Sequence, residues 1–370
     1  PTPTHHRLAA VPACRSVSPQ KRKARLASAA ARNRQLCYTK AMRIVFMGSS
    51  QASAMCLRAI LRLPGLQVVG VVTQPDRPAG RGRDLTPCPC RKYARARGIV
   101  ECITPENVNA PEAVAWLRAK KPDVIAVVAF GQFLKDDILD MPRHGCINCH
   151  FSLLPKYRGA SPVTAALLAG DELTGVSVIR MGRGMDDGPV LRTAVEPIYS
   201  DDTGDTLMER LAIAGGVTLA KTLKLIEADA LPPPVEQEDA RATFAHKIKK
   251  TDGLIHWNAK SREIERLLRA YTPWPGCYTF LPARFRRKGN TGRVVVTGVD
   301  FLKTADADPA WRAELPGTVV ACRERGPVVR TGDGVLLITS LKAEGARELA
   351  GGDFLRGRPL LPKSDMLLEG

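Results

Sequence analysis

Apolar positions in the first part of the chain gather in short continuous runs that end at glycine, proline or polar residues. Runs of this length without polar alternation are typical of strands buried on both faces. Residues 111–120 and 205–228 instead have a helical pattern, and Ser49 and Ser50 are suited to cap a helix that extends through Arg62. We therefore expect an α/β domain with a mostly parallel sheet and helices on both faces. Its strands are expected at residues 43–47, 66–72, 123–129, 146–148 and 174–180.

The pattern changes after Leu231-Pro-Pro-Pro234, a segment that cannot continue a helix and that we interpret as a linker. One helix is expected near residues 261–270. Short apolar runs separated by glycine then predict a small β-barrel. These runs lie at residues 292–299, 317–321, 328–331 and 334–341. The expected organisation is a first domain over residues 42–230, a linker over 231–244 and a second domain over 245–370.

Polar side chains suited to chemistry follow two of the expected strands. Asn148 and His150 flank one residue, so in an extended chain their side chains face the same way. The Phe130-Gly131 turn follows the preceding strand. Because ligands of open α/β sheets bind beyond the carboxyl ends of the strands, these residues should converge on one edge of the sheet.

A carboxylate joins this set if the Met185-Asp-Asp-Gly188 segment returns to the same edge. An amide and an imidazole can polarise a carbonyl group, and a carboxylate can help remove the proton of an attacking amine. We predict Asn148, His150 and Asp186 as catalytic residues, with Asp187 as a rival because adjacent side chains point differently. The structural alternative is an asparagine in a turn, a histidine bonded to the backbone and an aspartate that caps a turn.

A second candidate site is the loop from Gln74 to Arg83, which combines Arg77, Arg81 and Arg83 with glycines. Arginine pairs well with phosphate, so this loop is a candidate contact to nucleic acid. The alternative is a solvated loop with no partner. The Gly48-Ser-Ser-Gln-Ala-Ser53 segment matches neither GxGxxG nor a Walker loop, and we reject a dinucleotide or ATP site on that ground.

Charge is unevenly distributed along the chain of 370 residues. The net charge is +18, and residues 1–42 supply half of it, with nine Lys or Arg and no Asp or Glu. This composition is typical of an organelle transit peptide, so we expect residues 1–41 to be a leader that directs the protein to a mitochondrion or plastid. The alternatives are an untranslated leader, a disordered basic tail and a cytoplasmic protein. The remaining positive charge favours a polyanionic partner. No apolar run is long enough to predict a membrane span.

The ten cysteines are scattered along the chain and do not indicate a disulfide framework. Cys146 and Cys149 have CxxC spacing, which raises the alternative of a metal or redox site. We interpret both as buried reduced thiols and expect no metal.

The segment Asn148-x-His150-x-Ser152-Leu-Leu-Pro155, followed by Tyr157-Arg-Gly159 and the later Asp186, resembles the 10-formyltetrahydrofolate-dependent formyltransferases. The resemblance extends over about residues 42–360. Within that family the chain is most similar to the members that act on methionyl-tRNA. The stretches that carry this closer resemblance are Pro75 to Gly82, Ala242 to Ile248 and Arg269 to Gly276.

This resemblance implies a Rossmann-like catalytic domain and a C-terminal barrel of the OB type. It implies transfer of the formyl group of 10-formyltetrahydrofolate to the amino group of methionine on initiator tRNA, with Asn148, His150 and Asp186 as the catalytic set. We expect a monomer. Contacts to the folate donor are implied at Ser152, Leu153, Leu154, Pro155, Phe130 and Gly131. Contacts to initiator tRNA are implied at Arg77, Arg81, Arg83 and Arg158.

Two departures from the family pattern are visible. The first loop is Gly48 to Ser53 instead of the usual Gly-Thr-Pro-x-Phe-Ala, and Cys149 replaces the usual Val or Ile. Three alternatives stay open: transfer to a small amine such as glycinamide ribonucleotide, hydrolysis of formyl-folate, and a non-catalytic RNA-binding protein. The arginine loop and the long C-terminal region argue against a small substrate, and the complete catalytic set argues against a protein that only binds RNA.

Overall fold

The computed structural model describes residues 41–79, 84–285, 291–303 and 306–368. The expected leader lies almost wholly outside these residues, as do Arg81 and Arg83. From Met42 onward the chain forms one compact unit. Its division into two domains at residues 231–244 therefore stays a prediction. None of the helices described is long and apolar enough to cross a membrane.

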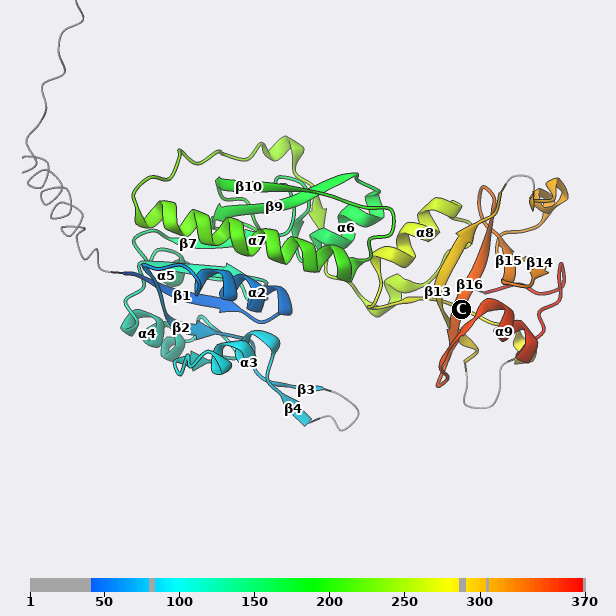
Figure 1. Cartoon of the computed structure of the whole chain (residues 1–370), viewed down its shortest axis with the longest axis horizontal. Helices are drawn as coiled ribbons and strands as arrows, with labels where there is room; N and C mark the ends of the chain where they lie inside the picture. The colour runs from blue at the N-terminus through cyan, green and yellow to red at the C-terminus, as the bar shows by residue number, and fades with distance from the viewer. Residues whose placement is uncertain (1–40, 80–83, 286–290, 304–305, 369–370) are drawn as a thin grey trace, which may run out of the picture. The chain divides into compact units, whose positions relative to one another are not determined.

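A seven-stranded sheet forms the first half of the described chain (Figure 1). Neighbouring strands from β7 to β5 run parallel, whereas β9 pairs antiparallel with both β7 and β10. This arrangement confirms the prediction of a mostly parallel sheet. The strand order is β10 (Val190–Pro197), β9 (Leu173–Arg180), β7 (Cys146–His150), β6 (Val124–Val128), β1 (Met42–Gly48), β2 (Leu66–Val72) and β5 (Cys102–Ile103).

Helices cover both faces of this sheet because its strands are apolar at consecutive positions. On β1, Ile44 and Phe46 belong to one core cluster, while Val45 and Met47 belong to the other. The first cluster includes residues of α2 (Gln51–Ile60), α3 (Pro89–Ala96) and α7 (Gly204–Glu227), and the second includes residues of α4 (Pro111–Ala119) and α5 (Asp136–Leu139). Ser50 caps α2 as expected, although that helix ends at Ile60 and not at Arg62.

The C-terminal region contains an antiparallel sheet, ordered β12-β13-β16-β15-β14 with β17 beside β16 among the described residues. Ile264 and Leu268 of α8 pack into its apolar core with Val294, Val296 and Leu336. The assignment of this sheet to the OB type stays a prediction. The elements are α8 (Ser261–Ala270), β12 (Cys277–Phe280), β13 (Arg293–Phe301), β14 (Val319–Arg323), β15 (Gly326–Arg330), β16 (Val335–Ala343), β17 (Glu348–Ala350) and α9 (Gly351–Gly357).

Several elements were not predicted from the sequence. The arginine loop expected from Gln74 to Arg83 contains β3 (Arg77–Ala79), which pairs antiparallel with β4 (Asp84–Thr86) directly after it. Others include α3, α5, α6 (Pro162–Ala169), α9, the edge strands β5 and β10, β12, β17 and the short parallel pair β8 (Arg158–Gly159) and β11 (Phe244–Ala245). Short 3-10 turns lie at Asp239–Arg241, Lys250–Gly253, Ala283–Phe285 and Pro309–Ala313.

Candidate active site

Strand β7 presents Asn148 and His150 on the same face of the sheet. Cys149 between them points into the opposite face, where it belongs to the core cluster that contains residues of α2 and α7. This alternation is that of an extended strand, as expected from the sequence. The two polar side chains therefore lie on the face away from α7.

Asp186 reaches these two side chains from the loop between β9 and β10. Its Oδ1 accepts a hydrogen bond of 3.0 Å from Asn148 Nδ2, and its Oδ2 lies 3.5 Å from His150 Nδ1. Oδ2 also accepts a hydrogen bond of 2.9 Å from the backbone amide of Gly159. The structure thus brings the amide, imidazole and carboxylate of the predicted set together.

The imidazole of His150 is buried and has a defined orientation. Its Nε2 lies 2.9 Å from the carbonyl oxygen of Tyr157. Because a carbonyl oxygen only accepts hydrogen bonds, Nε2 carries a hydrogen and donates it. In a neutral ring Nδ1 is then unprotonated and turned toward Asp186, where it can accept a proton.

Tyr157 is itself held in place. Its hydroxyl donates to Asp171 at 2.9 Å, and its amide donates to Thr243 Oγ1 at 2.9 Å. Burial, followed by the hydrogen bond to Asp171, raises the pKa of Tyr157, so its side chain stays a neutral phenol at physiological pH. These contacts fix the carbonyl group that orients His150.

The neighbouring Asp187 does not reach the set. Its Oδ2 accepts a hydrogen bond of 3.1 Å from the amide of Gly184 within the same loop. Asp186 has a left-handed backbone with φ of 50°, and this turn directs the two adjacent carboxylates differently. Of the two rivals, Asp186 is the one that faces His150.

The predicted folate contacts separate into two groups. Ser152 is fully buried and donates to the carbonyl of Lys156 at 2.6 Å, and Phe130 packs in the core. In this structure both side chains face the protein interior, and their contact with folate stays a prediction. Gly131 is exposed in a turn with φ of 83°, so the backbone at this turn stays available.

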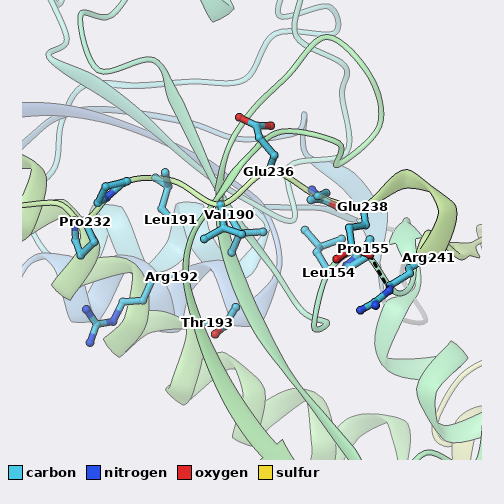
Figure 2. Close-up of a pocket in the computed structure, with 13 residues that line it drawn as sticks. Leu154, Pro155, Val190, Leu191, Arg192, Thr193, Pro232, Glu236, Glu238 and Arg241 are labelled. Atoms are coloured by element: carbon cyan, nitrogen blue, oxygen red, sulfur yellow. Dashed lines mark ion pairs between the residues drawn. The ribbon is translucent and has the colours of Figure 1, made fainter.

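Leu154 and Pro155 line a cavity of about 490 Å³ (Figure 2). The rest of the lining comes from β10 and from residues 232–241, and Arg192 and Arg241 are among its charged groups. Leu153, in contrast, packs against the backbone of Gly175. The size and the mixture of apolar walls with a few charged groups are typical of small-molecule sites.

The predicted tRNA contacts also have different outcomes. Arg77 is exposed on β3, where a donor to phosphate would be expected. Arg91 on α3 pairs with Asp76 at 2.5 Å and thereby ties the start of this hairpin to the helix. Arg81 and Arg83 lie outside the described residues.

Arg158, in contrast to Arg77, is buried. Its side chain is only 7% exposed, and its guanidinium donates to Gln237 Oε1 and to Asp239 Oδ1. Its guanidinium is thus paired within the protein, and its contact with tRNA stays a prediction. The contact of Gln237 with this site was not predicted, because Gln237 lies in the presumed linker and no motif marks it.

The CxxC pair does not form a joint site. Cys146 belongs to the core cluster on one face of the sheet and Cys149 to the cluster on the other. Burial raises the pKa of Cys146 to about 12, so its thiol is not ionised at neutral pH. Within the described residues, no cluster of three or more His, Cys, Asp or Glu side chains is arranged to hold a metal ion.

Comparison with known proteins adds a second line of support. Residues 42–223 match the sequence profile described as formyl transferase, and residues 247–359 match that of the formyl transferase C-terminal domain. Methionyl-tRNA formyltransferase of Pseudomonas entomophila is 41% identical over 317 residues, which cover 86% of this chain and 96% of that protein. The chain belongs to the formyl transferase family. This finding confirms the resemblance seen in the motif around Asn148 and His150.

Other relatives and solved structures agree with this family assignment. Methionyl-tRNA formyltransferase of Geobacter metallireducens is 39% identical over 319 residues, covering 86% of this formyl transferase and 96% of the relative. A sugar 3N-formyl transferase, WlaRD, crystallised in the presence of dTDP and 5-N-formyl-THF, has a TM-score of 0.56 at 17% identity and covers 84% of this chain and 98% of its own.

HypX from Aquifex aeolicus, solved with tetrahydrofolic acid, has a TM-score of 0.54 at 15% identity. The match covers 85% of this formyl transferase but only 47% of HypX. At these identities the two structures support the fold alone.

Proposed function

We propose that this formyl transferase moves the formyl group of 10-formyltetrahydrofolate to the amino group of methionine carried by initiator tRNA. The observation that carries the proposal is the convergence of Asn148, His150 and Asp186 on β7 and the adjoining loop. Relatives named methionyl-tRNA formyltransferase, about 40% identical over nearly their whole length, support the choice of acceptor. Structural neighbours solved in complex with tetrahydrofolic acid or in the presence of 5-N-formyl-THF support the choice of donor.

The chemistry follows from the hydrogens that each residue has available. One Nδ2 hydrogen of Asn148 is bound to Asp186, and the other can donate to the formyl oxygen as negative charge develops there. His150 donates its Nε2 hydrogen to Tyr157, so this hydrogen does not serve the oxyanion and Nδ1 is the atom that takes the amine proton. Asp186 then stabilises the resulting imidazolium across the short distance to Nδ1.

The step is balanced without a further reactant. The methionine nitrogen forms a bond to the formyl carbon and loses one proton, which His150 accepts. The bond between the formyl carbon and N10 of the donor breaks, and N10 receives that proton as tetrahydrofolate leaves. Leu154, Pro155 and the backbone at Gly131 are the proposed folate contacts, because they are accessible where Ser152 and Phe130 are not.

Recognition of tRNA is proposed for the hairpin that carries Arg77, together with the C-terminal sheet, for which we propose the OB type. After the nine positive charges of residues 1–42 are set aside, the rest of the chain still carries a net charge of +9. Counterion release from phosphates makes such a surface favourable for RNA binding. We also propose that the enzyme acts as a monomer, which sedimentation of the purified protein at several concentrations would test.

The decisive experiment measures transfer of labelled formyl groups from 10-formyltetrahydrofolate to charged initiator tRNA. We expect efficient transfer to initiator methionyl-tRNA and much less to elongator methionyl-tRNA or to glycinamide ribonucleotide. Preferred transfer to glycinamide ribonucleotide would show that the enzyme acts on a small amine. Release of free formate without an acceptor would indicate a hydrolase, and tRNA binding without transfer would indicate a protein that only binds RNA.

A further inference from the structure

The segment Val235–Ala245, here called the strap, runs along the loops that form the candidate active site. The two family profiles leave residues 224–246 unmatched, so the strap lies between them. Val235 forms an antiparallel bridge with Val190 through hydrogen bonds of 2.7 and 2.8 Å. At the other end, β11 in the strap pairs with β8, which contains Gly159. The strap is thus fixed to the site at both ends.

Gln237 in the strap contacts the turn that carries Asp186. Its Nε2 donates to the carbonyl of Asp186 at 2.8 Å and to the carbonyl of Gly188 at 2.7 Å. Its Oε1 accepts from Arg158 Nε at 3.1 Å and Nη2 at 2.9 Å. Carbonyl groups only accept and a guanidinium only donates, so these partners also fix which way the amide points.

The turn around Asp186 needs such support from outside. Three glycines, at positions 182, 184 and 188, surround Asp186, whose own φ of 50° is unfavourable for a residue with a side chain. Hydrogen bonds from Gln237 to the carbonyls at 186 and 188 restrict this turn on both sides of the aspartate. They thereby set where its carboxylate lies relative to Asn148 and His150.

We propose that Gln237 is a positioning residue for Asp186, and that the strap is therefore part of the catalytic site. This inference rests on the proposed function, because it assumes that Asp186 assists the transfer. Gln237 acts through the backbone of the turn and does not touch the reacting atoms. A role of this kind affects turnover more than substrate binding, because the distance from Asp186 to His150 matters most when charge develops on the imidazole.

The primary test is the variant Gln237→Glu in the full-length protein. The carboxylate keeps the volume and still accepts from Arg158, but it replaces the two donors to the Asp186 turn with an oxygen. We expect kcat for formyl transfer to methionyl-tRNA to fall at least about tenfold, with KM for folate and for tRNA within about twofold of the original. A raised KM for folate with normal kcat would instead make Gln237 a ligand of the cavity that it lines and would overturn the proposal.

The matched control is Asn109→Asp. Asn109 is also a loop amide, with Oδ1 accepting from the Lys135 amide at 2.9 Å and Nδ2 donating to the Phe133 carbonyl at 2.9 Å. The same change of amide to carboxylate there should leave kcat unchanged. If both variants lower kcat equally, the effect is a general loss of loop packing and the positioning role is wrong.

A double variant separates positioning from an independent effect. In an Asp186→Asn background, Gln237→Glu should lower kcat by less than about twofold further, because the group it positions is already changed. A full second loss would contradict the proposal. If Asp186→Asn alone keeps normal activity, the proposed function of the site is wrong. If Asp186→Asn is defective while Gln237→Glu is normal, only the positioning role of Gln237 is wrong.

Folding is checked by thermal unfolding of every variant. If Gln237→Glu does not fold, Gln237→Met replaces it, since methionine keeps the volume, carries no charge and cannot donate to the turn. The same split between kcat and KM is expected of this variant. Unchanged kcat in folded Gln237→Met would overturn the proposal.

Discussion

The hydrogen bonds that the structure shows at Asp186 are all donated by residues distant from it in the sequence. Asn148 and the Gly159 amide bind its carboxylate, and Gln237 binds its carbonyl. The common direction of Asn148 and His150 could be predicted, because strand alternation alone determines it. The contact of Gln237 could not, because the sequence around it has neither a periodic pattern nor a motif, and its position depends on how the strap folds back.

At this scale we predict that Asn148→Ala lowers kcat for formyl transfer by about a hundredfold or more. The change removes a donor to the developing oxyanion, and one such donor contributes roughly 3–4 kcal/mol to transition-state stabilisation. Single-turnover transfer assays and thermal unfolding provide the measurement and its control. We expect the unfolding temperature to stay close to that of the original protein, and near-normal turnover would contradict the role given to Asn148.

The sequence predicted the bounds of buried elements more accurately than those of exposed elements. Strand β6 lies between β7 and β1 and is buried along its whole length, so its continuous apolar run predicted its bounds to within one residue at each end. Strand β10 lies at the sheet edge and mixes exposed Arg192 and Thr193 with buried Leu191, so it leaves no continuous run. Helix α6 is short and apolar on all sides, and a pattern of that kind cannot be told from a strand by periodicity.

The start of α7 allows a prediction about pH. Burial would raise the pKa of Asp202, but the hydrogen bond from Arg210, helped by those from the Tyr199 amide and Thr206, outweighs it and lowers the pKa below its usual value of 3.8. A carboxylate with a lowered pKa stabilises the fold fully above its unfolded pKa, and this contribution is lost as the pH falls through the folded pKa. Asp202 is nearly buried, and it faces Arg210 at 2.5 Å.

We therefore expect Asp202→Asn to lower the free energy of unfolding by about 1–3 kcal/mol near neutral pH. The difference from the original protein should shrink as the pH falls below about 4. Urea unfolding at a series of pH values measures this difference. A difference that stayed constant over the whole series would mean that the charge of Asp202 does not stabilise the start of α7.

At the scale of the whole molecule, the location of the positive charges decides which arginines can take part in the proposed tRNA contact. Two arginines predicted to bind tRNA now differ in their surroundings, because Arg77 is exposed on a hairpin whereas Arg158 is buried against Gln237 and Asp239. The sequence alone does not predict that Arg158 is buried and Arg77 exposed, because both arginines lie in similar glycine-containing segments. The difference appears only when distant segments are assembled.

We predict that Arg77→Ala weakens binding of initiator tRNA and reduces the slope of log affinity against log salt concentration by about one. Filter binding at several salt concentrations gives both quantities. Arg118→Ala, an exposed cation on α4, serves as the control and should leave the slope unchanged. Arg158→Ala should lower the unfolding temperature without changing the slope, and an equal slope for Arg77→Ala and the original protein would count against the hairpin as an RNA contact.

We also propose that residues 1–41, which lie almost wholly outside the described part of the chain, direct the protein to a mitochondrion or plastid, since they are basic and lack acidic residues. Fused ahead of a fluorescent protein, they should direct it to one of these organelles, and the same peptide with its arginines and lysines replaced by glutamine should not. Diffuse cytoplasmic fluorescence of the unchanged fusion would refute the proposal.

The strap has a consequence for how this enzyme can be divided or recombined. A break at the end of the first matched region, near residue 223, would leave the sheet and all three polar groups on one piece and Gln237 on the other. The segment that must stay intact for the proposed positioning of Asp186 therefore extends through Ala245, beyond the end of the first matched region. An exchange of C-terminal halves between relatives would preserve the geometry around Asp186 only if the strap remained with the sheet on which it lies.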